Sequence, residues 1–198
     1  MRRVATVWRM SVRIGFLRAV NLGRRRVAMS RLAAVCEGLG YSDVWTFVNS
    51  GNVVFDAIGR RASVEAAMER ALEEELGFEC TTFVRTAQQL TATLDARPFT
   101  LAPGGTHFVT FLKKAPGATV AQRLEGLSND FDTLIVRGAD VHWRMRGKST
   151  DSRLGSRDWE TILGPLSSTS RNVTMLTRLV TKIDAAERPR GRPRLSRG

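Results

Sequence analysis

A short turn between two strand-like runs restricts the fold of this chain more than any other feature. Residues 44–48 (VWTFV) and 52–55 (NVVF) are rich in β-branched and aromatic side chains, which favour extended strands. Ser50 and Gly51 join the two runs, and glycine adopts at little cost the positive φ angles that tight hairpin turns require. The chain is therefore expected to contain an antiparallel hairpin and a sheet built around it.

The segments that flank this hairpin predict the rest of a first sheet. A buried strand is expected at residues 12–20, and apolar residues at helical spacing predict a helix that stops near Gly40. After the hairpin, Ser63 is the expected cap of a second helix, and residues 80–85 (CTTFVR) have the pattern of a further strand. The order β-α-β-β-α-β is that of a ferredoxin-like domain, in which the first and third strands are the inner ones.

The second half is predicted to be a smaller α+β unit. Thr86 and Gln89 stand at capping-box spacing before a short helix, and the stretch 101–106 (LAPGGT) is the expected linker. The patterns then predict a strand, a helix, two strands, a helical stretch and a last helix capped by Thr169 or Ser170. The expected fold class is α+β, divided into an N-terminal extension (1–11), a ferredoxin-like half (12–100), a second α+β half (101–186) and a flexible basic tail (187–198).

The excess of positive charge favours polyanionic partners. The formal net charge is +12, and removal of the last twelve residues still leaves +8, so the body is expected to be basic as well. All but four of the 31 basic residues are arginine, a skew that the codon supply of a GC-rich genome also produces. Charge alone therefore leaves two interpretations open, selection for nucleic-acid binding and codon bias.

The opening residues do not have the pattern of a membrane segment. Arginines interrupt the apolar residues of the stretch 1–16, so neither a signal peptide nor a membrane span is predicted. We expect a cytoplasmic protein with no membrane partner, and residues 1–9 are open to interpretation as sequence upstream of a true start at Met10.

Cysteine and histidine are too sparse to indicate a cofactor. Cys36 and Cys80 do not make a disulfide framework, which suits a reducing compartment. His107 and His142, the two histidines, do not form a zinc ligand set by spacing. No metal and no cofactor are expected.

Three stretches together resemble a known family. They are RAVNLG (18–23), VWTFVNSGNVVF (44–55) and TSRNVTMLTRL (169–179). In this order and spacing they resemble DUF1697, small bacterial proteins that contain a domain of unknown function, over roughly residues 12–183. Val173 and Thr174 depart from the family pattern, which has Trp and Asn there. The resemblance implies a fold and names no reaction.

The same stretches supply a candidate ligand site. Arginine side chains, asparagine amides and glycine-permitted backbone N–H groups are suited to an anionic or phosphorylated ligand, and an arginine at a helix start would add to such a site. The alternative is that the asparagines form turns and that Arg171 pairs with a carboxylate. The candidate residues are Arg18, Asn21, Gly23, Ser50, Gly51, Asn52, Arg171 and Asn172.

No catalytic residue is predicted, so whether the chain is an enzyme stays open. Ser50 does not stand in a G-x-S-x-G elbow. The stretch 147–150 (GKST) imitates the end of a phosphate-binding loop, but His142 stands where the first glycine of that loop is required.

The tail, ERPRGRPRLSRG, predicts a DNA contact. Residues 189–193 (PRGRP) match the core of an AT-hook, in which glycine lets the backbone enter a narrow minor groove and the arginines follow its floor. The expected DNA-binding residues are Arg188, Arg190, Gly191, Arg192, Pro193, Arg194 and Arg197. Such short matches also arise by chance in arginine-rich ends.

Three function classes follow. The leading one is a non-enzymatic binding protein whose tail contacts DNA. The others are a protein or enzyme that binds a small anionic ligand, and a protein–protein interaction module that pairs through the edges of its sheet.

Overall fold

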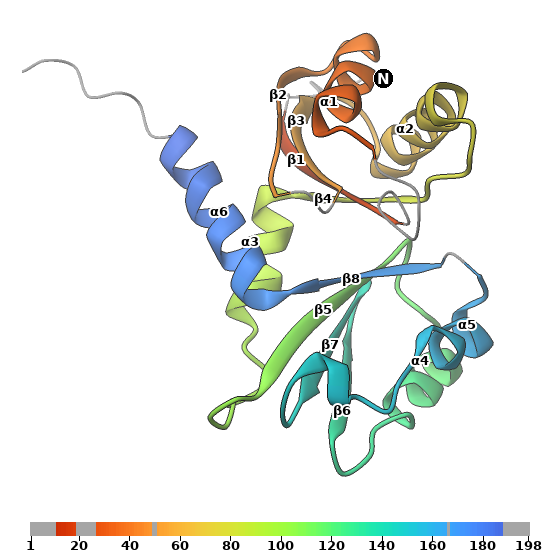
Figure 1. The fold of residues 1–198 in the computed structure, drawn as a ribbon, viewed down its shortest axis with the longest axis vertical. Coiled ribbons are helices and arrows are strands. Elements are labelled where there is room, and N and C mark those ends of the chain that lie inside the picture. The colour runs from red at the N-terminus through yellow and green to blue at the C-terminus, as the bar shows by residue number, and fades with distance from the viewer. Residues whose placement is uncertain (1–10, 19–26, 49–50, 166, 188–198) are drawn as a thin grey trace, which may run out of the picture.

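The computed structural model of the 198-residue chain describes residues 11–18, 27–48, 51–165 and 167–187. Within them the chain forms two four-stranded antiparallel sheets and six α-helices (Figure 1). No helix in these ranges is long and apolar enough to span a membrane.

The first sheet contains the predicted hairpin and has the strand order β2-β3-β1-β4. Its strands are β1 (Ser11–Leu17), β2 (Ser42–Thr46), β3 (Asn52–Ala57) and β4 (Thr82–Thr86). Helices α1 (Met29–Gly38) and α2 (Arg61–Leu76) cover one face, and their buried side chains, among them Leu32 and Met68, pack against Val53 and Phe55 of β3. The predicted order of elements and the two inner strands are confirmed.

The second sheet repeats this arrangement, with the order β6-β7-β5-β8. Its strands are β5 (Thr106–Leu112), β6 (Asp132–Arg137), β7 (Asp140–Met145) and β8 (Ser168–Asn172). Helices α4 (Ala118–Glu125) and α5 (Ser156–Leu163) cover its outer face, and a short 3-10 turn (Ser149–Asp151) precedes α5. The two halves thus have the same element order.

The inner faces of the sheets share one core. Helix α3 (Ala87–Asp95) follows β4, helix α6 (Val173–Glu187) follows β8, and the two helices contact each other beside the sheets (Figure 1). Phe16 of β1 and Phe111 of β5 stack between the sheets, with ring centroids 4.3 Å apart and planes 3° from parallel. Leu90 of α3 and Leu176 of α6 complete this core, which is built from both halves.

Two of the predicted helix starts are wrong and one is confirmed. Helix α2 begins at Arg61, so Ser63 lies inside its first turn rather than at its cap. Thr169 and Ser170 belong to strand β8, because pairing with β5 draws this polar stretch into the second sheet. The capping box of Thr86 and Gln89 is present at the start of α3.

Candidate functional site

Part of the predicted ligand edge assembles at the junction of the two sheets. Arg18 follows β1, Gly51 and Asn52 lie where β3 begins, and Arg171 lies on β8. The Leu17 N–H donates to the Gly51 carbonyl at 2.8 Å, which ties the end of β1 to the hairpin. Asn21, Gly23 and Ser50 lie outside the described residues.

Arg171 is half-buried and contacts the opposite half. Its Nε donates to Oδ1 of Asn52 at 2.7 Å, and its Nη2 donates to the Leu17 carbonyl at 2.8 Å. Its Nη1 donates to Thr169 Oγ1, and the guanidinium lies 5.7 Å from the ring centroid of Phe16. Burial lowers the pKa of Arg171 to about 10, which still leaves it protonated at neutral pH.

Arg18 makes the reverse connection, from the first half to the second. Its Nη1 donates to the Ser168 carbonyl at 2.5 Å, and its Nη2 forms an ion pair with Glu160 of α5 at 2.8 Å. The predicted site residue Asn172 accepts the backbone N–H of Thr174 at 2.8 Å and thereby caps α6.

Both connections have a counterpart related by the internal repeat. Arg85 of β4 donates to Asp140 of β7 and to the Leu112 carbonyl, and its guanidinium lies 5.2 Å from the Phe111 ring centroid. Lys113 pairs with Glu69 and donates to the Thr82 carbonyl. The four cations therefore act as a reciprocal clamp between the halves, and we call Arg18, Arg85, Lys113 and Arg171 the clamp residues.

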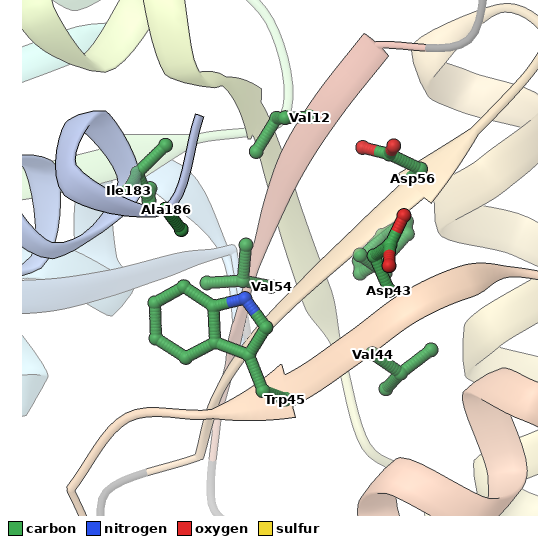
Figure 2. Close-up of a pocket in the computed structure, with 9 residues that line it drawn as sticks. Val12, Asp43, Val44, Trp45, Val54, Asp56, Ile183 and Ala186 are labelled. Atoms are coloured by element: carbon green, nitrogen blue, oxygen red, sulfur yellow. The ribbon is translucent and has the colours of Figure 1, made fainter. Parts of the chain in front are cut away.

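A pocket that sequence patterns did not predict lies at the other end of the first sheet. Its cavity volume is about 540 Å³. It opens between the edge strand β2, its inner neighbour β3, the start of β1 and the end of α6 (Figure 2). It is lined by Val12, Asp43, Val44, Trp45, Val54, Phe55, Asp56, Ile183 and Ala186.

A bulge shapes one wall of this pocket. The pairing register of β2 and β3 shifts between Ser42 and Trp45, and Asp43 within the shift has a φ of 49°. In Figure 2 the carboxylates of Asp43 and Asp56 lie on one side, and the indole of Trp45 extends across the pocket toward α6. The pocket thus combines an acidic side with an apolar and aromatic one.

On the acidic side of the pocket, the charged form of Asp56 is disfavoured. Burial, and then the neighbouring charge of Asp43, raise the pKa of Asp56. Within the described ranges, neither aspartate forms an ion pair. The nearby cation of α6 is Lys182, whose Nζ lies 4.6 Å from the ring centroid of Trp45.

A second pocket, with a volume of about 390 Å³, lies between α3, α6 and the start of β5. His107 lines it, and Nε2 of His107 lies 3.1 Å from Nδ1 of the buried His142. Burial, and then His142, lower the pKa of His107 to about 4, so this imidazole is neutral at pH 7.

The described residues contain no cluster of three or more side chains suited to hold a metal ion. Cys36 and Cys80 are buried, and burial is the main cause that raises the pKa of each thiol to about 12. Neither thiol is therefore ionised at neutral pH, and neither is equipped to act as a nucleophile.

The positive charge is concentrated outside the described fold. Eleven arginines and no acidic residue fall in its gaps and ends, which account for +11 of the formal +12. They are Arg2, Arg3, Arg9, Arg24, Arg25, Arg26, Arg188, Arg190, Arg192, Arg194 and Arg197. The described residues are therefore close to neutral, and six of the eleven arginines belong to the part of the chain that precedes the tail.

Comparison with known proteins agrees with this two-sheet fold. The model of the family described as protein of unknown function (DUF1697) matches residues 10–142, two thirds of the chain. The chain belongs to the DUF1697 family. The match includes the first two stretches that resemble the family and ends before the third, TSRNVTMLTRL. No curated protein matches the chain.

A solved structure has a similar fold. The conserved bacterial protein SP0830 from Streptococcus pneumoniae matches with a TM-score of 0.62 and 18% identity, over 89% of this chain and 99% of that one. At this identity the likeness concerns the fold alone.

Proposed function

We propose that this DUF1697 protein is a binding protein whose basic ends contact DNA. The observation that carries the proposal is the distribution of charge. The described residues are nearly neutral, and eight of the eleven arginines outside them belong to the two ends of the chain, so most of the excess positive charge that attracts phosphate is at the ends.

The attachment points of the two basic ends support the proposal. Val12 near the first described residue and Ala186 near the last line the same pocket. The described chain therefore begins near the point where it ends, and the sequence places Arg2, Arg3 and Arg9 before the first point and five arginines after the second. Two basic segments that start at neighbouring points are suited to bind one stretch of duplex.

Fluorescence anisotropy with A·T-rich and G·C-rich duplexes at several salt concentrations tests the proposal. The full chain is compared with a chain that ends at Ala186. Each phosphate contact contributes about 0.9 to the slope of log affinity against log salt, so loss of the tail is expected to lower the slope by up to about 4 to 5. A preference for A·T that disappears with the tail supports minor-groove binding by residues 189–193.

A charge-matched variant is the control. It replaces four exposed arginines by glutamine, namely Arg123, Arg137, Arg146 and Arg157, which equals the net loss of four charges when five arginines and Glu187 are removed. Its salt slope is expected to change less than that of the truncated chain. If both proteins lose the same slope, or if truncation at Ala186 leaves the slope unchanged, the proposal is wrong.

The small anionic ligand is the second candidate. The convergence of Arg18, Asn52 and Arg171 favours it, but their contacts already connect the two halves. A thermal-shift screen of phosphorylated ligands against the parent and an Arg18→Ala variant tests it, and equal shifts would argue against this site. The third alternative, a protein–protein module, has as its candidate surface the outer strand β2.

We also assign each half to the ferredoxin-like class. The support is the order β-α-β-β-α-β and the strand orders β2-β3-β1-β4 and β6-β7-β5-β8.

A further inference from the structure

We propose that the pocket between the β2–β3 bulge and α6 binds a small organic monocation with an aromatic or aliphatic body. The ammonium or guanidinium group would lie at Asp43 and Asp56, and the body would pack on Trp45, Val54 and Ile183. The proposal does not depend on DNA binding by the basic ends.

The dimensions of the pocket suit such a ligand. Its volume of about 540 Å³ falls within the range of about 300–1,000 Å³ that is typical of small-molecule sites. Its walls come from the sheet on one side and α6 on the other, so a ligand would contact two elements that are far apart in the sequence (Figure 2).

The arrangement of side chains defines two ends for the ligand. The carboxylates of Asp43 and Asp56 stand on neighbouring strands at one side, and Figure 2 shows them turned toward the same space. On the other side, the Trp45 indole, Val54 and Ile183 form an apolar surface. A molecule with a charged head and an apolar body matches both ends at once.

The charge balance selects a cation. Among the described residues that line the pocket, two are carboxylates and none is a cation. A bound monocation offsets the desolvation and the like-charge repulsion that Asp56 experiences. The face of Trp45 also accepts a cation in this structure, since Lys182 lies over it at 4.6 Å.

Isothermal titration calorimetry on the full chain tests the proposal with three probes of similar shape. They are phenethylammonium, the neutral 2-phenylethanol and the anionic phenylacetate. Saturable binding is expected for phenethylammonium, with affinity at least about tenfold weaker for the other two, because a charge-assisted hydrogen bond contributes that much or more.

Variants locate the site. Asp56→Asn and Asp43→Asn are each expected to weaken phenethylammonium binding about tenfold, whereas Asp130→Asn on the exposed surface leaves it unchanged. Trp45→Leu is expected to weaken it several-fold, and Trp45→Phe to restore part of the loss. If Trp45→Leu fails to fold, as judged by circular dichroism, the two aspartate variants decide the question.

The chain's own arginines carry guanidinium groups, which are cations of the kind that the proposed pocket would bind and are therefore candidate competitors of the probe. The titration is therefore repeated on a full-length variant in which the five tail arginines are glutamine. Tighter binding by this variant supports the pocket's preference for cations and identifies the tail as a competitor. Absence of binding in both proteins, or equal affinity of the parent and Asp56→Asn, overturns the proposal. The ligand titration does not measure the salt dependence of DNA binding. Each of the two proposals can therefore be rejected without the other.

Discussion

At the scale of single residues, two arginines at equivalent positions of the repeat both connect the two halves, but through different partners. Arg85 pairs with the carboxylate of Asp140, whereas Arg171 donates to the amide of Asn52. In both cases the guanidinium crosses to the opposite half and lies over a phenylalanine ring. The Arg85–Asp140 contact is a buried ion pair, with side chains 3% and 10% exposed.

Replacement of Asp140 by alanine is expected to lower the free energy of unfolding by about 3–5 kcal/mol. The reason is that Arg85 would keep a buried charge without its carboxylate partner. Urea denaturation monitored by tryptophan fluorescence measures the change.

Asp130→Ala serves as the matched control, because its pair with Arg153 is largely exposed. Loss of that pair is expected to change the free energy of unfolding by about 0–1 kcal/mol. Similar losses for the two variants would contradict the role assigned to the Arg85–Asp140 pair.

At the scale of elements, pairing between strands brings together side chains that are distant in the sequence or placed by a bulge. The pair β5 and β7 brings His107 and His142 into contact, although 35 residues separate them. The pair β2 and β3 contains the bulge that positions Asp43 beside Asp56. The histidine pair and the acidic pocket are thus consequences of strand pairing rather than of any one segment.

The histidine pair predicts a loss of stability on acidification. His107 has a pKa of about 4 in the folded chain against an ordinary value of 6.5, so between these values the unfolded chain binds a proton that the folded chain does not. The free energy of unfolding is expected to fall as the pH drops from about 6.5 toward 4. Urea denaturation across this range should show a shallower fall for His107→Gln, and identical pH profiles would contradict the prediction.

The sequence predicted elements whose patterns are local and missed those that depend on a partner. The hairpin around Gly51 was predictable because alternation and turn residues lie within a few positions. Strand β8 was not, because Ser168–Asn172 has the polar residues of a helix cap and becomes a strand by pairing with β5.

The candidate site divides in the same way. An expected turn marked Asn52 and an expected helix start marked Arg171, but no pattern indicates that two residues 119 positions apart bond to each other. The register shift at Asp43 is likewise absent from any periodicity, so the acidic pocket was out of reach of sequence patterns.

At the scale of the whole molecule, the described residues of the two sheets and their helices form three hydrophobic cores. Two of these cores lie under the outer helix pairs, and the third lies between the sheets and takes side chains from both halves. The clamp residues cross the same boundary in both directions. We therefore expect the halves to unfold together.

Phe111→Ala tests this expectation. Removal of the stacked ring is expected to lower the free energy of unfolding by about 3–5 kcal/mol through lost burial and a cavity. Because the ring contacts Phe16, amide hydrogen exchange should accelerate in β1 and β3 of the first half as well as in β5. Faster exchange confined to the second half would show that the halves unfold independently.

The internal repeat has a consequence for how the two pockets differ. In a symmetric dimer of one half, every substitution would appear twice, and the surroundings of both pockets would stay identical. Within a single chain, Val12 of the acidic pocket has His107 as its counterpart, and Asp56 has Arg144. The two halves thus have similar backbones but different side chains at equivalent positions. A substitution in one pocket therefore leaves the residues of the other pocket unchanged.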